Sequence, residues 1–254
     1  MSLLKKNRLA CYKSRFSLEF FKNPQYAYTL YQATQQALAL KYDTISVIEF
    51  GVAGGSGLRY LEKHAGILTE LTGLKFEVYG FDTAEGLPEL EGYKDIMHQW
   101  RAGSFPMDLE LLKSSLKTAK LVIGDVKDTI GDFYETYKPA PVGAILFDVD
   151  LYSSTKSALR IFDTAPENFL PRVRCYFDDI IGNETALTNE FMGEKLAIAE
   201  YNDLSDNKKI TPVYHMLAKS ILRKWYPKCY VHHMFDHPRY SDFIANPNQF
   251  SPLR

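Results

Sequence analysis

The sequence lacks the features of a secreted or membrane-spanning protein. Its 254 residues include three widely separated cysteines, Cys11, Cys175 and Cys229, and no Cys-x-x-Cys pair. Three widely spaced cysteines do not form a disulfide framework, so we expect a reducing, cytoplasmic environment. Cys175 lies in an apolar, strand-like run, and we expect it to be a buried packing residue. No stretch approaches the ~20 apolar residues of a membrane span, and Met1–Arg8 lacks the apolar core of a signal peptide. A membrane is therefore not an expected partner.

An excess of charge of either sign is also absent. The chain carries 30 Lys and Arg against 31 Asp and Glu, a formal net charge of -1. This balance gives no electrostatic reason to expect nucleic acid as a partner. Hydrophobic residues make up 46% and aromatic residues 14% of the chain, which excludes a disordered protein and suits one large α/β domain.

Two common catalytic or binding motifs are missing. Ser153, Ser154 and Ser157 are not part of a Gly-x-Ser-x-Gly elbow, so serine hydrolysis has little support. The glycine-rich stretch Glu49–Gly57 departs from the dinucleotide fingerprint, because Ala and Ser occupy two of its glycine positions. A nucleotide-dependent oxidoreductase is thus a disfavoured alternative.

What the sequence does contain is a regular alternation of strand and helix patterns, without repeats or linkers. Strands are predicted at 46–50, 76–81, 120–123, 144–147, 173–177, 210–214 and 230–235. Helices are predicted at 24–41, 58–65 (closed by Gly66), 109–116, 128–137, 154–163 and 188–201, with another possible at 217–225. This order predicts a three-layer, mostly parallel α/β sheet.

The remaining segments divide the chain into two parts. Residues 1–22 are basic and aromatic without a clear period, and we interpret them as an arm that packs on the domain or on another subunit of a homo-oligomer. Residues 1–45 are then an N-terminal arm and helix, and 46–254 the main domain. Within it, 84–108 has no sustained period and resembles a long functional loop or lid.

Polar residues gather where the predicted strands end. Each of the first five strands along the chain is followed by a glycine-rich turn or by aspartates. In parallel sheets, ligands bind outside the carboxyl ends of the strands. We therefore expect one crevice to hold the turn 51–57, Asp82, Asp125, the pair Asp148 and Asp150, and the pair Asp178 and Asp179.

The turn after the first strand is the first candidate binding site. Its glycines permit a tight turn and a close approach of a ligand, with a helix N-terminus behind. Glu49, just ahead of the turn, would repel a pyrophosphate but attract a cationic ligand. The pattern favours S-adenosylmethionine as cofactor, and a plain turn with a solvated Glu49 is the alternative. The expected contacts are Glu49, Gly51, Val52, Gly54, Gly55 and Ser56.

Two further acids extend this cofactor site. Asp82, next to Thr83, ends the second strand, where a carboxylate can accept both ribose hydroxyls; a turn or N-cap role is the alternative. Asp125 follows Gly124 at a position where adenine contacts often lie, although Gly-Asp is also ordinary turn chemistry.

The acids after the fourth and fifth strands are candidate metal ligands. Carboxylate oxygens suit Mg²⁺. Neighbouring strand residues point to opposite faces, so Asp178 and Asp179 can share an ion only if the strand ends before them. Helix capping and solvated turn acids are the alternative, and Ser153–Thr155 is expected to cap the following helix.

Histidines give a weaker signal. His232 and His233 are adjacent in a predicted strand and diverge, so packing is favoured over a soft-metal site that would include His237. His98 and Trp100 in the long loop are better candidates for lining a substrate pocket.

Five motifs, taken in order, resemble the macrocin O-methyltransferase family of class I S-adenosylmethionine-dependent enzymes. Gly80–Pro88 reads GFDTAEGLP, similar to the family's GFD-(S/T)-FEGLP, and Asp148–Thr155 reads DVDLYSST, similar to D-x-D-L-Y-x-S-T. The other three are Glu49–Ser56, Gly124–Ile130 and Asp178–Asp179. The likeness covers about 46–192 and departs at Ala84, at Asp125–Val126 and at Ile180.

The resemblance implies a Rossmann-like fold with a mostly parallel seven-stranded sheet and one antiparallel strand near the C-terminus. It implies Mg²⁺ bound by Asp148, Asp178 and Asp179, with Asp148 as general base. Methyl transfer to a hydroxyl of a small molecule, such as a sugar or glycosylated natural product, is the implied activity. A cofactor-binding regulatory or partner protein without methyl transfer is the alternative, which the intact acids disfavour.

Overall fold

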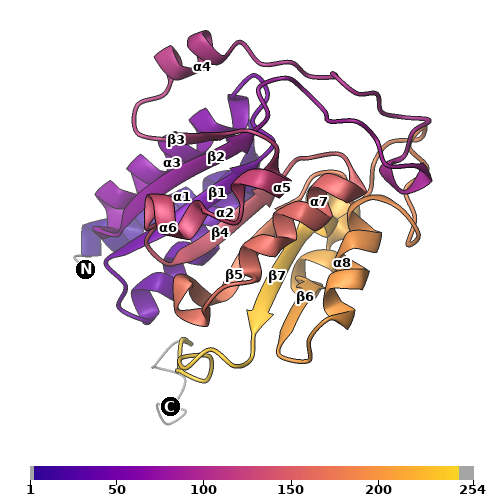
Figure 1. The fold of residues 1–254 in the computed structure, drawn as a ribbon. Helices are drawn as coiled ribbons and strands as arrows, with labels where there is room; N and C mark the ends of the chain where they lie inside the picture. The colour runs from indigo at the N-terminus through magenta and orange to yellow at the C-terminus, as the bar shows by residue number, and fades with distance from the viewer. Residues whose placement is uncertain (1–2, 246–254) are drawn as a thin grey trace.

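The computed structural model describes residues 3–245 and shows one central sheet between two layers of helices (Figure 1). The sheet has the order β3-β2-β1-β4-β5-β7-β6, and β7 runs antiparallel to both of its neighbours while the other pairs are parallel. Its strands are β1 (Thr44–Phe50), β2 (Lys75–Asp82), β3 (Lys120–Ile123), β4 (Val142–Phe147), β5 (Phe169–Phe177), β6 (Lys208–Pro212) and β7 (Cys229–Met234). The seven predicted strands and the single antiparallel one are confirmed.

Helices cover both faces of the sheet. One layer consists of α1 (Leu3–Ser17), α2 (Pro24–Ala39) and α3 (Ser56–Thr72). The opposite layer consists of α5 (Val126–Thr129), α6 (Phe133–Tyr137), α7 (Tyr152–Leu159) and α8 (Gly193–Asp203). Shorter helices, α4 (Leu109–Ser115) and α9 (Tyr214–Leu217), lie in the connections.

Alternating side chains give the sheet its two cores. In β1, Ile45 and Val47 face the α1–α3 layer, while Ile48 and Phe50 face the other. Because successive strand residues point to opposite faces, Glu49 shares the face of Ile45 and Val47. Across the second core, the Phe147 and Phe177 rings stack with centroids 4.4 Å apart, which fixes β4 against β5. The functional side chains are thus aimed by the same alternation that builds the core.

Two N-terminal expectations differ from the structure. Residues 3–17 form helix α1, which we did not predict, because its apolar positions are interrupted by lysine and arginine. The helix expected to end at Gly66 runs on to Thr72 and ends at Gly73, whose φ of +86° suits a left-handed cap. Gly66 lies inside the helix, where a glycine is tolerated at a modest cost.

Three later helices are shorter than expected. The one predicted at 128–137 is divided into α5 and α6, since the chain turns at 130–132. Helix α8 starts at Gly193 rather than at residue 188, and the segment 217–225 contains only short helical turns. The actual ends of a helix depend on capping and on tertiary contacts, and the spacing of apolar residues in the sequence contains no information about either.

No helix within residues 3–245 has the length and apolar character needed to cross a membrane. The three cysteines are free, and Cys175 is buried in β5 as expected.

The docking of α1 gives a direct test of the N-terminal layer. Phe16, in α1, is 3% exposed and contacts the rings of Tyr28 and Tyr31, whereas Phe20, just after the helix, is 69% exposed. We expect Phe16→Ala to lower the free energy of unfolding by about 3–5 kcal/mol, because it leaves a cavity. Phe20→Ala should change it by less than ~0.5 kcal/mol.

Urea denaturation monitored by circular dichroism measures both variants. Equal midpoints for the two would show that α1 is only a loosely attached arm.

Candidate active site

The register of β4 against β5 brings the predicted metal ligands together. Phe147 pairs with Phe177, so the next residues, Asp148 and Asp178, leave neighbouring strands at the same level. The Asp178 amide donates to the Phe147 carbonyl at 2.9 Å and forms the last rung between the two strands. The two carboxylates therefore emerge side by side at the carboxyl edge of the sheet.

The chain bends immediately after β5, and this bend adds Asp179 to the group. The strand ends at Phe177, and residues 178–180 form a bend rather than continuing the ladder. One carboxylate oxygen from each of Asp148, Asp178 and Asp179 lies within 4.8 Å of the others. The condition set by strand geometry, that the strand end before the acid pair, is met.

Crowding of these acids has a clear electrostatic result. Desolvation by the surrounding protein, and then the charges of Asp178 and Asp179, raise the pKa of Asp148 to about 8, although its side chain is exposed toward the cavity. Burial also raises the pKa of Asp150 and of Asp179. Nearby carboxylates add to this effect, Asp179, Asp148 and Asp178 at Asp150 and Asp178 at Asp179. A positive charge placed among them would relieve this repulsion.

One positively charged side chain already offsets part of this repulsion. The Lys228 ammonium donates to Asp178 Oδ1 at 3.2 Å, and its charge lowers the pKa of Asp148 and Asp179 in part. Tyr176 also donates to Asp178 Oδ1, at 2.9 Å. Asp179 Oδ2, in contrast, is buried and has no hydrogen-bond partner within the described part of the chain.

The glycine-rich turn lies directly beside this acidic edge. Gly51 has φ +82°, and a Cβ there would lie 1.8 Å from the Asp148 carbonyl oxygen, so only glycine fits. At Gly57, in the first turn of α3, a Cβ would lie 1.8 Å from Glu49 Oε1 and 2.3 Å from the Tyr26 hydroxyl. The helix start is therefore pressed against Glu49.

Glu49 is buried and only half satisfied. Tyr26 of α2 donates to Glu49 Oε1 at 2.5 Å, while Oε2 is buried and has no hydrogen-bond partner among the residues that the structure describes. Burial, followed by the charges of Asp148 and Asp82, raises the pKa of Glu49 well above its usual range despite the Tyr26 hydrogen bond. The expected alternative of a solvated Glu49 is excluded.

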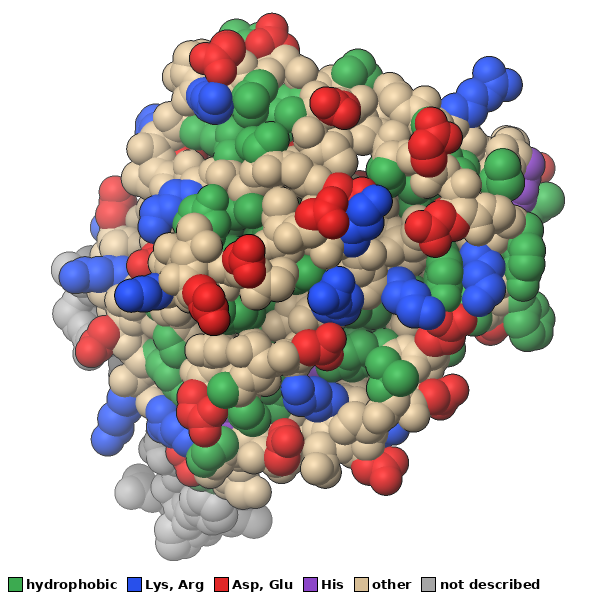
Figure 2. Space-filling view, viewed as in Figure 1, with side chains coloured by type: hydrophobic (Ala, Val, Ile, Leu, Met, Phe, Trp, Pro, Cys, Tyr) green, Lys and Arg blue, Asp and Glu red, His purple; other side chains and the backbone are tan. Residues whose placement is uncertain are grey.

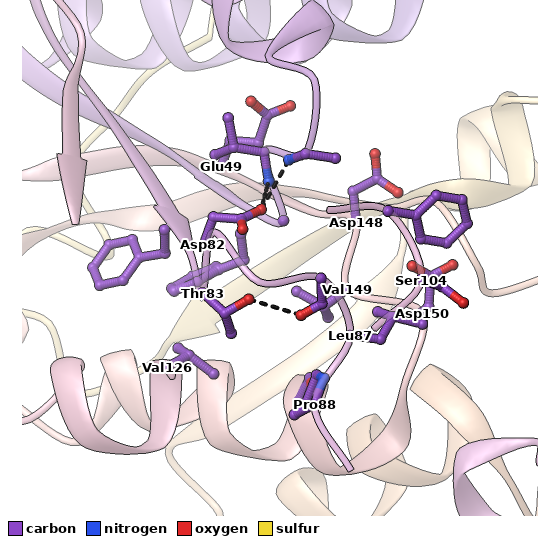
Figure 3. A pocket seen from close by; sticks show the side chains of 18 of the residues that line it. Glu49, Asp82, Thr83, Leu87, Pro88, Ser104, Val126, Asp148, Val149 and Asp150 are labelled. Atoms are coloured by element: carbon purple, nitrogen blue, oxygen red, sulfur yellow. Dashed lines mark hydrogen bonds between the residues drawn. The ribbon is translucent and has the colours of Figure 1, made fainter. Parts of the chain in front are cut away.

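Asp82 holds the glycine-rich turn in place. Its Oδ2 accepts the amides of Val52 and Ala53, both at 2.8 Å (Figure 3). Its Oδ1 accepts the amide of Ala84 at 2.7 Å. Thr83 donates to the Gly86 carbonyl and closes the next turn. The proposed ribose contact would have to share Asp82 with these amides.

Asp125 has local partners as well. Its Oδ1 accepts the Lys127 amide at the start of α5, and its Oδ2 forms an ion pair with the Lys127 ammonium at 3.0 Å. Asp125 therefore acts as a turn residue at the start of α5, and its contact with adenine stays a prediction.

A single cavity of about 370 Å³ joins the two halves of the site. Figure 3 shows Asp82 and the glycine-rich turn on one side, and Asp148 and Asp150 on the other. Among the described residues expected in this crevice, three do not line the cavity: Gly55 faces Leu112, and Asp178 and Asp179 lie beside Asp148. The predicted residues that line it are Glu49, Gly51, Val52, Gly54, Ser56, Asp82, Thr83, Gly124, Asp125 and Asp148.

The cap of α7 differs from our expectation. Its N-cap is Leu151, and neither the Ser153–Thr155 hydroxyls nor Asp150 cap the helix. Asp95, in the insertion, accepts the Ser153 amide at 2.8 Å and the Ser153 hydroxyl at 2.9 Å. The cap is thus supplied from 58 residues away, which local sequence patterns do not reveal.

The insertion and the histidines also depart in part from expectation. His98 bonds to the Ala186 carbonyl, and Trp100 contacts the Phe105 ring; neither lines the cavity, which receives Leu87, Pro88, Ser104 and Phe105 instead. His232, as expected, is a packing residue, stacked on Phe162 and bonded to Tyr201.

Sequence reasoning missed four polar residues around the site. Tyr26, Asp95, Glu194 and Lys228 each contact a predicted site residue or the helix that follows it. Glu194 in particular accepts the Asp179 amide at 2.9 Å. All four are separated from their partners in sequence, so local patterns do not link them. Glu194 also lies in the first turn of α8, where an acidic side chain is usually solvated.

Comparison with solved structures supports the fold. CalS11, described as a calicheamicin methyltransferase, superimposes with a TM-score of 0.53 at 17% identity, over 93% of this chain and 95% of that one. The O-methyltransferase NovP gives 0.48 at 18% identity, over 70% of this chain and 72% of that one. No protein-family model and no curated protein sequence matches the chain.

The sheet order, the antiparallel β7 and the likeness to CalS11 define the class I methyltransferase fold. Its ligand crevice lies at the carboxyl ends of the strands, where the cavity is found.

Two glycines of the turn provide a matched test of this geometry. We expect Gly57→Ala to lower the free energy of unfolding by about 1–3 kcal/mol, because the new methyl overlaps Glu49 and Tyr26. Gly54→Ala meets nothing within 4 Å and should be close to neutral.

Chemical denaturation of the two variants is the measurement. A neutral Gly57→Ala would show that Glu49 is not held against the start of α3.

Proposed function

We propose that the protein is a Mg²⁺-dependent O-methyltransferase that transfers a methyl group from S-adenosylmethionine to a hydroxyl of a small molecule. A sugar or a glycosylated natural product is the proposed acceptor. Membership of the macrocin O-methyltransferase family, suggested by the five motifs, is part of this proposal. The class I methyltransferase fold shared with CalS11 is compatible with it.

The observation that carries the proposal is the continuity of the site. One cavity is bordered at one side by a glycine-rich turn with a buried acid and at the other by Asp148 and Asp150, and Asp148 belongs to the cluster of three carboxylates. Its volume of about 370 Å³ lies in the range of small-molecule sites. A donor at the turn and an acceptor held at Asp148 can therefore meet within one cavity.

The residues present suit S-adenosylmethionine. Glu49 lines the cavity, and its Oε2 is a buried acceptor without a hydrogen-bond partner among residues 3–245. A cationic ligand would offset the burial of Glu49 and would be attracted by the carboxylate of Asp148. Asp82 would hold the turn against the cofactor, since it fixes the Val52 and Ala53 amides.

The acidic edge suits Mg²⁺ equally. Its ligand atoms are carboxylate oxygens, which hard divalent cations prefer. One of them, Asp179 Oδ2, is buried and makes no hydrogen bond to any other described residue. Asp148, Asp178 and Asp179 would hold the ion. When bound, it would lower the pKa of a coordinated hydroxyl and direct its oxygen.

Asp148 would remove the proton that the acceptor hydroxyl loses on methylation. It is the candidate ligand that lines the cavity, and it stays accessible from there. Residues of the insertion, Leu87, Pro88 and Phe105, border the same cavity and would help to exclude water.

Ligand binding separates this proposal from its alternatives. Isothermal titration should show binding of S-adenosylmethionine and none of NAD, since Glu49 disfavours a pyrophosphate. Adding Mg²⁺ should strengthen the binding of a diol acceptor. Tight NAD binding would favour an oxidoreductase, and cofactor binding without any metal-enhanced diol binding would favour a regulatory protein.

The chemical step is tested at Asp148. We expect Asp148→Asn to lower kcat by at least ~100-fold, because a positioned base is lost, while S-adenosylmethionine affinity stays within about three-fold. Asp128→Asn, on exposed α5, is the control and should keep normal turnover. EDTA should abolish activity, and Mg²⁺ should restore it.

Turnover of an accepted hydroxyl substrate is measured for each. Normal kcat in Asp148→Asn would disprove the role of the base, and full activity in EDTA would disprove the role of the metal.

A further inference from the structure

We propose that Asp95 and Glu194 are positioning residues that hold the two ligand-bearing turns of the acidic edge in their metal-binding geometry. The inference rests on the proposed cation site and assigns a second task to the insertion 84–108. Neither residue is a candidate ligand. Both are fully or almost fully buried, at 0% and 1% exposed, and both hold backbone groups next to the ligands.

Glu194 fixes the bend that carries Asp178 and Asp179. The Asp178 amide makes the last rung to β4, and the next amide, that of Asp179, leaves the ladder and donates to Glu194 Oε2 at 2.9 Å. Without this acceptor, the Asp179 amide would be a part-buried donor that has lost the one partner recorded for it among the described residues. The bend that lets both acids face one ion is therefore stabilised by Glu194.

Asp95 fixes the other ligand-bearing turn. Residues 148–151 run from the end of β4 to the start of α7, and Asp150 within them has φ +60°, a left-handed conformation that Asp adopts more readily than most residues other than glycine. The Asp148 amide holds one end by donating to Phe50. Asp95 holds the other end through the amide and hydroxyl of Ser153, and its Oδ2 also accepts the Glu91 amide at 2.6 Å.

The two residues are linked through direct packing. Ile96, next to Asp95, is buried with φ +55°, which is strained for a β-branched residue. It contacts Gly193, the residue before Glu194, where a Cβ would lie 3.1 Å from Ile96 Cδ1. The segment 91–96 is thus wedged between the starts of α7 and α8, and in Figure 1 the insertion runs to these helices.

Two parts of the insertion 84–108 have different roles in this arrangement. Its rim, with Ser104 and Phe105, lines the cavity, but its inner segment supports the ligands instead of covering the substrate. Groups that orient metal ligands typically contribute 10–100-fold to metal affinity. Cation binding should therefore depend on Asp95 and Glu194, although neither would touch the ion.

The test measures Mn²⁺ binding by electron paramagnetic resonance of the free ion. We expect Glu194→Ala and Asp95→Ala to weaken Mn²⁺ binding by about 10-fold or more, with S-adenosylmethionine affinity unchanged. Glu194→Gln keeps an acceptor oxygen for the Asp179 amide and should stay within about three-fold of the unsubstituted protein. This rescue separates positioning from a requirement for the negative charge.

Asp108→Ala is the matched control, because Asp108 caps α4 from within the same insertion, away from the acidic edge. It should bind Mn²⁺ normally. If the Asp95→Ala and Glu194→Ala variants bind Mn²⁺ as tightly as the unsubstituted protein does, this inference is overturned and the proposed cation site is not. If the unsubstituted protein binds no Mn²⁺, the proposed cation site is overturned as well.

Hydrogen exchange of the unsubstituted, cation-free protein gives a measurement that does not depend on whether variants fold. The Asp179 and Ser153 amides should be protected to the same degree as the ends of β4 and β5. Rapid exchange of both, with the strands still protected, would contradict the proposal.

Discussion

Repulsion among carboxylates at the ends of β4 and β5 is the constraint on which the rest of the site depends. The register that stacks Phe147 on Phe177 leaves Asp148 beside Asp178, and the bend after β5 adds Asp179. Such crowding destabilises the folded chain, since each charge disfavours its neighbours. This repulsion is offset by the stacked aromatic core, which fixes β4 against β5, and by the hydrogen bonds that Lys228 and Tyr176 donate to Asp178. Clustered acids of this kind are a common sign of a functional site.

The half of the site around the glycine-rich turn also contains a buried acid that is held by a residue from another element. Glu49 is buried by the alternation of β1 and is held by Tyr26 from the N-terminal layer. Gly57 allows α3 to begin directly against it, and Asp82 fastens the turn between them. The N-terminal helices therefore do more than cover the sheet, because α2 supplies a direct contact to the site.

Sequence patterns predicted the sheet and most of the cavity lining, because these depend on local alternation and on which residues follow each strand. Asp148, Asp178 and Glu49 were found in this way. Asp95 and Glu194 were not, since each acts through a hydrogen bond to a backbone amide distant in sequence. Helix α1 was missed because its apolar residues are separated by basic ones, and the end of α3 was misplaced because Gly66 sits inside the helix.

The most direct test of the central claim, that one crevice binds both the methyl donor and a divalent cation, is a crystal structure with S-adenosylhomocysteine and Mn²⁺. Anomalous scattering should place a single Mn²⁺ peak among Asp148, Asp178 and Asp179, with the cofactor product against Gly51 and Asp82. A cofactor bound elsewhere, or no Mn²⁺ peak at these three carboxylates, would contradict the account.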